Sequence, residues 1–218
     1  MQLITEQIIY PSSDGQPMAD STIQYRWITQ IKGGCDAIFK DDPNVFVAGD
    51  LFWYPVEGNS NICQAPDVMV VFGRGKSERK SYRQWQEENI APQVIFEVRS
   101  ESDSQTKMDK KLVFYNRYGV EEYYLYDPAD KDLRGWRRTE GLLDVIDPMS
   151  GWVSPRLGVR FELNDEGLEL YAPNGEKFVD YLELYQQREQ ERQQKELAQQ
   201  RAERLAAQLR AAGIEPEA

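Results

Sequence analysis

The spacing of apolar residues predicts three helical segments. Apolar residues recur at intervals of four after Ser21, as far as Gly33 and Gly34, where the missing side chains are expected to end the first helix. Helical spacing returns over residues 104–118. Residues 181–212 are rich in Gln, Glu, Arg and Ala and contain no turn residue. We therefore expect them to form one long helix.

Short apolar or alternating runs between these helices predict strands. They cover residues 45–48, 51–54, 68–72, 93–99 and 120–126. Residues 73–91 form a polar insert, expected to be a loop with a short helix over residues 82–88. From residue 133 to 171, short strands alternate with Gly, Pro and Asn-Asp turns and indicate an antiparallel extension. This order predicts an α/β (α+β) core.

The predicted C-terminal helix has a seam that is apolar only in part. Its apolar members follow one another at spacings of four and three, as in a coiled coil: Ala198, Ala202, Leu205 and Leu209. Continuing this spacing backward places Arg188, Glu191 and Lys195 on the same seam. We expect residues 1–180 to form one domain and residues 181–218 a helical tail. The tail is interpreted as a dimerisation or docking helix, with a solvated single helix as the alternative.

Composition excludes several kinds of chemistry. The 218 residues contain no histidine, which excludes Ser-His-Asp and Cys-His catalysis and His-ligated metal sites. Cys35 and Cys63 are too far apart for a Cys-x-x-Cys motif, so a reduced cytoplasmic setting is expected. No segment is long and apolar enough to suggest a membrane span, and the start lacks the features of a signal peptide. The net charge of −11 argues against nonspecific nucleic-acid binding.

One carboxylate stands in an otherwise apolar strand. Residues two apart in a strand share a face, so Glu97 lies with Ile95 and Arg99. A glutamate there is costly to bury unless a cation neutralises it. Asp67 begins the preceding apolar strand and is a plausible second ligand for Mg²⁺, which prefers hard oxygen donors. The alternative is a structural ion pair of Glu97 with Arg99 or with a lysine of the next helix.

A lysine on the following helix favours phosphodiester chemistry. Met108, Leu112 and Tyr115 form the apolar stripe of that helix, and Lys111 lies on the same side. An ammonium beside two carboxylates and a metal ion can orient an attacking water and offset charge on the phosphate oxygens. The alternative is a lysine whose stem is buried while its ammonium reaches solvent.

Several segments together resemble the Uma-type family of restriction-endonuclease-like proteins, which belongs to the PD-(D/E)XK superfamily. The segments are Ala65-Pro66-Asp67-Val68, Phe96-Glu97-Val98-Arg99-Ser100, and residues 47–55, 81–85, 111–115, 118–128 and 151–158. Their order carries the resemblance, which covers most of the chain. It implies a restriction-endonuclease-like mixed central sheet flanked by helices.

The resemblance also implies roles for individual residues. Asp67 and Glu97 match the metal-binding acids of the superfamily, for Mg²⁺ or Mn²⁺, and the carbonyl of Val98 often completes such a site. Asp50 matches a recurrent aspartate and is a candidate outer ligand. The superfamily lysine is replaced here by Arg99, which cannot lose a proton at neutral pH, so the lysine is expected to be Lys111.

Three further expectations concern auxiliary residues. Arg99 and Tyr115 are possible auxiliary residues of the site. Many relatives carry a glutamate on the first helix; no residue matches it clearly, and Asp36 is a weak candidate. A basic run in the polar insert is predicted to contact nucleic acid, although a solvated loop is the alternative: Arg74, Lys76, Arg79 and Lys80.

Two functions follow from these observations. The first is a metal-dependent endonuclease with DNA as its substrate, using Asp67, Glu97 and Lys111, and forming a homodimer through its C-terminal helix. The second is an inactive module of the same fold that recruits a partner through that helix.

Overall fold

The structure is a computed structural model that describes residues 8–13, 15 and 19–211. The chain divides into a larger unit, Met1–Phe178, and a smaller unit, Val179–Ala218. The predicted division after residue 180 lies close to this boundary. The two units are described separately.

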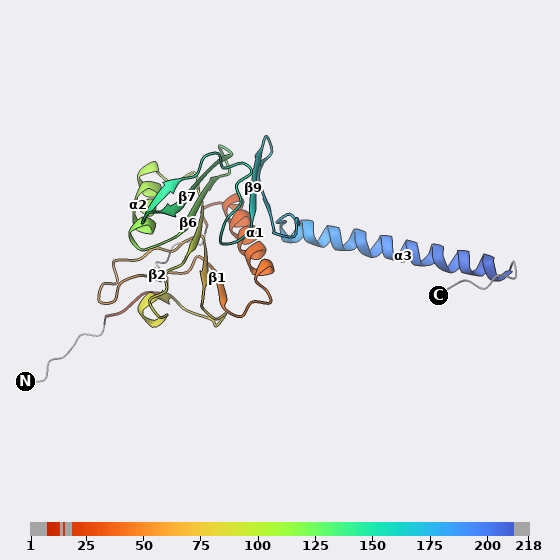
Figure 1. Cartoon of the computed structure of the whole chain (residues 1–218), viewed down its shortest axis with the longest axis horizontal. Helices are drawn as coiled ribbons and strands as arrows, with labels where there is room; N and C mark the ends of the chain where they lie inside the picture. Colours follow the sequence, from red (N-terminus) through yellow and green to blue (C-terminus); the bar gives the residue numbers. More distant parts are fainter. Residues whose placement is uncertain (1–7, 14, 16–18, 212–218) are drawn as a thin grey trace, which may run out of the picture. The chain divides into compact units, whose positions relative to one another are not determined.

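Within the described residues, a six-stranded mixed sheet forms the centre of the larger unit (Figure 1). Its strands lie in the spatial order β1 (Val45–Gly49), β3 (Val68–Phe72), β5 (Val94–Val98), β6 (Glu122–Asp127), β7 (Asp132–Thr139) and β8 (Leu142–Val145). The β5–β6 pair is parallel and the other pairs of this sheet are antiparallel. Strands β9 (Arg160–Asn164) and β10 (Gly167–Tyr171) form a separate antiparallel pair. The predicted mixed central sheet and antiparallel extension are confirmed.

Alternating side chains of the central sheet face two different cores. The first core lies under α1 (Thr22–Ile38) and includes side chains of β9 and β10; its members include Trp27, Ile31, Val68, Phe96 and Phe161. The second lies under α2 (Gln105–Arg117); its members include Met69, Ile95, Met108, Tyr115 and Tyr123. Helices α1 and α2 therefore cover opposite faces of the sheet, which is flanked by helices as predicted (Figure 1).

The first helix does not end at its two glycines. Helix α1 continues through Gly33 and Gly34 to Ile38. A Cβ atom at Gly34 would lie 2.2 Å from a ring carbon of Phe178. The glycine therefore allows the ring to pack directly on the helix backbone, and this tertiary contact outweighs the low helix propensity of glycine.

Two predicted elements differ in extent or type. The strand expected over residues 51–54 is reduced to β2 (Trp53–Tyr54). Residues 82–88, expected to be a short helix, begin as β4 (Tyr82–Arg83), which pairs in parallel with β2. A 3₁₀ turn, Gln84–Gln86, follows β4. Tyr82 is fully buried in the second core, so packing against the sheet decides its conformation.

The smaller unit contains α3 (Tyr181–Ala211), a helix of 31 residues. The predicted long helix is confirmed over this range, and residue 212 lies outside the described residues. Within the described residues, no helix combines the length and hydropathy needed to span a bilayer.

Candidate functional site

Asp67 and Glu97 converge because β3 and β5 are neighbours. Val68 pairs with Phe96 in the antiparallel register, and one further step along both chains places Asp67 opposite Glu97. The backbone N–H of Val98 donates to Oδ2 of Asp67 at 2.7 Å. Both carboxylates are buried, with Asp67 7% and Glu97 2% exposed.

Helix α2 brings two further groups to Glu97. The ammonium of Lys111 lies 2.6 Å from Oε2 of Glu97, and the hydroxyl of Tyr115 donates to Oε1. One turn of helix separates Lys111 from Tyr115, so both reach the same carboxylate. The side chain of Lys111 is 12% exposed, which means that the ion pair is largely removed from water.

Burial and neighbouring charges shift the pKa values of this cluster. Burial, together with the charge of Glu97, raises the pKa of Asp67 well above its ordinary range. For Lys111, burial acts to lower the pKa, but Glu97 and Asp67 outweigh it and the pKa is raised. Burial raises the pKa of Tyr115, and Glu97 raises it further. Lys111 is therefore a cation and Tyr115 a hydroxyl donor at neutral pH.

The carbonyl of Val98 is held by the first helix. Nε2 of Gln24 donates to this carbonyl at 2.9 Å, and Oε1 of Gln24 accepts from the N–H of Asp20 at 2.8 Å. Gln24 also takes part in the N-cap of α1, because its own N–H donates to the hydroxyl of Ser21. Gln24 therefore connects α1 to the site, through its hydrogen bond to the carbonyl of Val98. Asp36 does not, because it is exposed and pairs with Lys32.

Asp67 and Lys111 open onto a pocket of about 430 Å³. Charged residues that line the pocket come from several segments: Asp20, Asp50, Asp67, Asp103, Lys107 and Lys111. Four aspartates against two lysines give the pocket a negative formal charge. Such a pocket attracts cations and repels phosphates unless a cation is bound.

Sequence reasoning missed the loop that leads into α2. Burial acts to raise the pKa of Asp103, but its hydrogen bonds with Lys107 and with the N–H of Ser100 outweigh burial and lower it. Asp20 accepts hydrogen bonds from the hydroxyls of Ser100 and Ser102. Ser104 before the helical run signalled the helix start. No spacing in the sequence signalled that Asp20 would meet this loop.

The two other candidate residues of the site differ: Asp50 lines the pocket and Arg99 does not. Asp50 lines the pocket, close to Asp67, since its N–H donates to the carbonyl of Asp67 at 3.3 Å. Arg99 is directed to Asp127, at 3.2 Å, and to the carbonyl of Asp103. The ion pair of Glu97 is therefore formed with Lys111 and not with Arg99.

The four basic residues of the polar insert lie outside this pocket. Arg74 and Arg79 form ion pairs with Glu87 at 3.0 and 2.6 Å. Lys76 donates to two backbone carbonyls, and Lys80 is exposed. The guanidinium groups are engaged within the insert, and their contact with nucleic acid stays a prediction.

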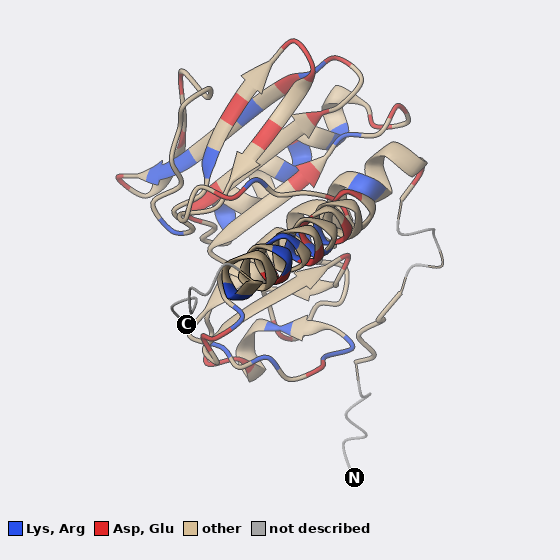
Figure 2. Cartoon of the chain, turned by 90° about the vertical axis from the view of Figure 1, so that its right-hand side faces the viewer, with Lys and Arg blue, Asp and Glu red and all other residues tan. Residues whose placement is uncertain are grey.

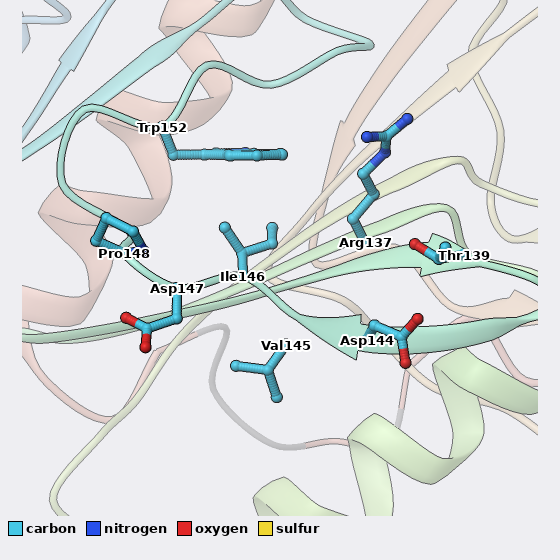
Figure 3. Close-up of a pocket in the computed structure, with 8 residues that line it drawn as sticks. All are labelled: Arg137, Thr139, Asp144, Val145, Ile146, Asp147, Pro148 and Trp152. Atoms are coloured by element: carbon cyan, nitrogen blue, oxygen red, sulfur yellow. The ribbon is translucent and has the colours of Figure 1, made fainter.

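A second pocket, of about 360 Å³, lies beside β7 and β8. Figure 3 shows the ring of Trp152 above Ile146, with Arg137 to one side. Its two carboxylates, of Asp144 and Asp147, point away from each other (Figure 3). This pocket therefore lacks the converging acids of the first.

Comparison with known families identifies the family of the chain. Residues 3–164 match the model of the Uma2 family, which is described as "Putative restriction endonuclease". The chain belongs to the Uma2 family. The matched region contains Asp67, Glu97 and Lys111. Membership of the Uma2 family supports a nuclease function.

A solved structure is also similar to this Uma2 protein. It is described as the crystal structure of "a putative nuclease belonging to DUF820 from Anabaena variabilis ATCC 29413". The two chains share 17% identity with a TM-score of 0.47, over 64% of this chain and 74% of the other. No curated protein matches the chain.

Proposed function

We propose that this Uma2 protein is a divalent-metal-dependent endonuclease that hydrolyses DNA phosphodiester bonds. The observation that carries the proposal is the meeting of Asp67 and Glu97 on neighbouring strands, with the ammonium of Lys111 2.6 Å from Glu97. The pocket that Asp67 and Lys111 line has room for a backbone phosphate. A nuclease function is supported independently by the family match.

The donor set fits Mg²⁺ or Mn²⁺. The candidate ligands are the carboxylates of Asp67 and Glu97 and the carbonyl of Val98, all hard oxygen donors. Among the residues that the structure describes, no three His, Cys, Asp or Glu side chains gather as a metal site, so water is expected to complete the coordination. Each oxygen of Glu97 already accepts one hydrogen bond but keeps a further lone pair.

A bound cation would also offset the negative charges of the two carboxylates. Asp67 and Glu97 disfavour each other's charge, which is one reason that the pKa of Asp67 is raised. When bound, a divalent cation supplies Lewis-acid stabilisation for phosphodiester hydrolysis. Asp50 lines the same pocket and is proposed as an outer ligand.

The chain's own residues would act as donors rather than as bases. Lys111 keeps its proton because its pKa is raised, so it offsets charge that develops on the phosphate oxygens and can orient a water molecule. Tyr115 holds Glu97 in place through its hydroxyl. Arg99 is held by Asp127 and takes no proton from substrate.

One observation favours a second function. Both oxygens of Glu97 are satisfied within the protein, by Lys111 and Tyr115, as in a purely structural ion pair. A protein that had lost catalysis could keep such a cluster for stability alone. It would then serve as a binding or assembly module, in agreement with its net charge of −11.

Calorimetric titration of Mn²⁺ and Mg²⁺ distinguishes the two functions. We expect wild type to bind the ion and Asp67→Asn to lose binding, because the substitution removes an anionic ligand. Asp36→Asn is the matched control, since Asp36 is an exposed aspartate that pairs with Lys32. Absence of binding by wild type, or equal binding by Asp67→Asn, would leave only the second function.

Plasmid nicking tests the reaction itself. With Mg²⁺ or Mn²⁺, wild type should convert supercoiled DNA to the open circle, and EDTA should stop the reaction. Glu97→Gln should reduce nicking by at least a hundredfold while circular dichroism shows a folded protein. Equal nicking by wild type and Glu97→Gln would exclude the proposed site.

A further inference from the structure

Helix α3 carries exposed apolar side chains along one stripe. No residue of α3 is buried, and three of its leucines are exposed: Leu184 by 44%, Leu205 by 59% and Leu209 by 38%. Basic residues (Lys, Arg) and acidic residues (Glu) both occur along it (Figure 2). An exposed apolar stripe on a long helix that is mainly polar is typical of a helix that binds another helix.

The stripe belongs to a continuous coiled-coil seam. We call it the α3 seam; its members follow one another at alternating spacings of three and four, from Tyr181 through Leu184, Arg188, Glu191, Lys195, Ala198, Ala202 and Leu205 to Leu209. Apolar residues lie at both ends of the seam and three charged residues lie in its centre. The partner must therefore be apolar at both ends and must complement a central sequence of positive, negative and positive charge.

A second copy in parallel orientation does not complement this seam. In a parallel pair in register, each seam residue faces its own counterpart. Arg188 would face Arg188, Glu191 would face Glu191, and Lys195 would face Lys195. Three consecutive layers of like charge would destabilise the pair.

A second copy in antiparallel orientation does complement it. With the pair centred on residue 193, Glu191 of each helix faces Lys195 of the other. The remaining layers bring apolar side chains together or set the aliphatic stem of an arginine against alanine: Tyr181 with Leu205, Leu184 with Ala202, and Arg188 with Ala198. The overlap covers residues 181–205 of both helices, roughly 37 Å at about 1.5 Å per residue.

Other antiparallel registers are less complementary. A shift by one heptad in one direction sets Lys195 against Ala198 and Glu191 against Ala202, so no opposite charges meet. A shift in the other direction pairs Arg188 with Glu191 but moves Leu205 beyond the partner's α3. The centred register alone pairs Glu191 with Lys195 and also covers Leu184 and Leu205.

The residues that flank the centre are compatible with this register. Arg192 lies beside the centre, where the two copies of its guanidinium approach each other. Each is already paired within its own helix, with Glu189 at 2.9 Å and with Glu196 at 3.9 Å. These internal pairs reduce the repulsion between the two copies of Arg192.

We propose that α3 binds the α3 of a second copy of this chain as an antiparallel helical pair centred on Gln193. Glu191 and Lys195 set its orientation and register, and Leu184 and Leu205 provide its apolar contacts. This proposal concerns assembly alone and does not depend on nuclease activity.

Cysteine cross-linking of the full chain tests the orientation. The background is Cys63→Ser, because Cys35 is fully buried and Cys63 is not. Leu184→Cys and Ala202→Cys are purified separately, one with a size tag, and oxidised alone and as a mixture. The antiparallel pair predicts little cross-linking of either variant alone and a disulfide-linked heterodimer in the mixture. Cross-linking of each variant with itself, or no cross-linking at all, would overturn the proposal.

Charge reversal tests the register. Lys195→Glu places Glu against Glu in both central layers, and Glu191→Lys places Lys against Lys. By symmetry, each substitution affects two contacts, so we expect the dimer Kd from sedimentation equilibrium to rise about tenfold. Combining both substitutions restores opposite charges and should return the Kd to within about threefold of wild type.

Arg204→Glu is the matched control, because it makes the same charge change as Lys195→Glu on a position outside the α3 seam. It should leave the Kd within about threefold of wild type. A wild-type protein that stays monomeric, or a double variant that is not rescued, would refute the pair. Capture of a different protein by monomeric chain would assign α3 to another partner and would equally refute it.

Discussion

Removal of the ammonium at position 111 is the most direct test of the buried cluster. Lys111→Met keeps an unbranched side chain of similar length and comparable helix propensity but removes the charge. The substitution leaves Glu97, which is 2% exposed, and Asp67, which is 7% exposed, without their closest cation. Measurements are made in EDTA so that no metal ion replaces the lost charge.

Two independent arguments give the magnitude. Removing one partner of a buried ion pair typically costs about 3–5 kcal/mol of unfolding free energy. The protein can limit this cost by taking up one proton, because Lys111 is one of the groups that lower the pKa of Asp67. Protonating an aspartate of ordinary pKa, about 3.9, at pH 7 costs about 4 kcal/mol, which is an upper limit for Asp67 because its pKa is already raised. We therefore expect a loss of about 3–4 kcal/mol.

The dependence on pH has a definite sign. The pKa of Asp67 is raised in the folded protein, so the folded state binds a proton more tightly than the unfolded state. Stability then falls as pH rises from the unfolded pKa through the folded one. Without Lys111, which lowers the pKa of Asp67, this pKa is raised further and the fall in stability with rising pH is larger. The difference between variant and wild type should therefore be smaller at pH 5 than at pH 7, by at most about 1.4 kcal/mol for each pH unit.

Urea unfolding at pH 7 and pH 5 measures both quantities. Lys110→Met is the matched control, because Lys110 is an exposed lysine on the same helix. We expect the control to change stability by less than about 0.5 kcal/mol. A loss below about 1 kcal/mol for Lys111→Met, or a loss that is larger at pH 5 than at pH 7, would show that the ion pair is not buried as described.

Three further substitutions test the packing of the fold. Gly34→Ala should cost about 1–3 kcal/mol of unfolding free energy in urea, because its Cβ would lie 2.2 Å from the ring of Phe178. Gly33→Ala is the control: its Cβ would have nothing within 4 Å, so it should stabilise α1 by up to about 1 kcal/mol. Similar effects of the two substitutions would contradict the described packing. Ser154→Ala removes a hydroxyl that donates to the buried Glu122 at 2.5 Å, and should lower the thermal midpoint with a loss of about 1–3 kcal/mol. An unchanged midpoint would mean that this bond is not formed.

Local patterns were sufficient to predict the elements that carry the site. The apolar run over residues 68–72 and the run that contains Glu97 are β3 and β5, because buried strands need continuous apolar sequence. The convergence of Asp67 with Glu97 also required that these strands be neighbours in one register, which a single sequence does not state. The Uma-type resemblance supplied that information. Helical spacing then placed Lys111 and Tyr115 on the sheet side of α2.

What could not be predicted depends on contacts between distant segments. Gln24 lies 74 residues from Val98, and its place three residues after Ser21, at the start of the helix, gave a sufficient local reason for it, so its hydrogen bond to the carbonyl of Val98 was hidden. Gly34 signals a helix end by propensity, but a ring 144 residues later occupies the space that its missing side chain leaves. Gln24 satisfies a local rule and Gly34 breaks one, and in both cases a contact with a distant segment decides what the residue does.

The two proposed functions differ in whether a metal ion can replace Lys111 in neutralising Glu97 and Asp67. In wild type, Lys111 partly neutralises Glu97 and Asp67, so a cation that binds these acids must share Glu97 with an ammonium 2.6 Å away. In Lys111→Met this competition is absent. If the site binds metal, Mg²⁺ or Mn²⁺ should therefore restore part of the lost stability, by about 2.7 kcal/mol at one hundred times Kd, and should bind the variant at least as tightly as wild type. If Glu97 and Lys111 form only a structural pair, thermal unfolding of Lys111→Met will be the same with metal and with EDTA. That result would exclude the metal-dependent mechanism even if the correct DNA substrate were never found.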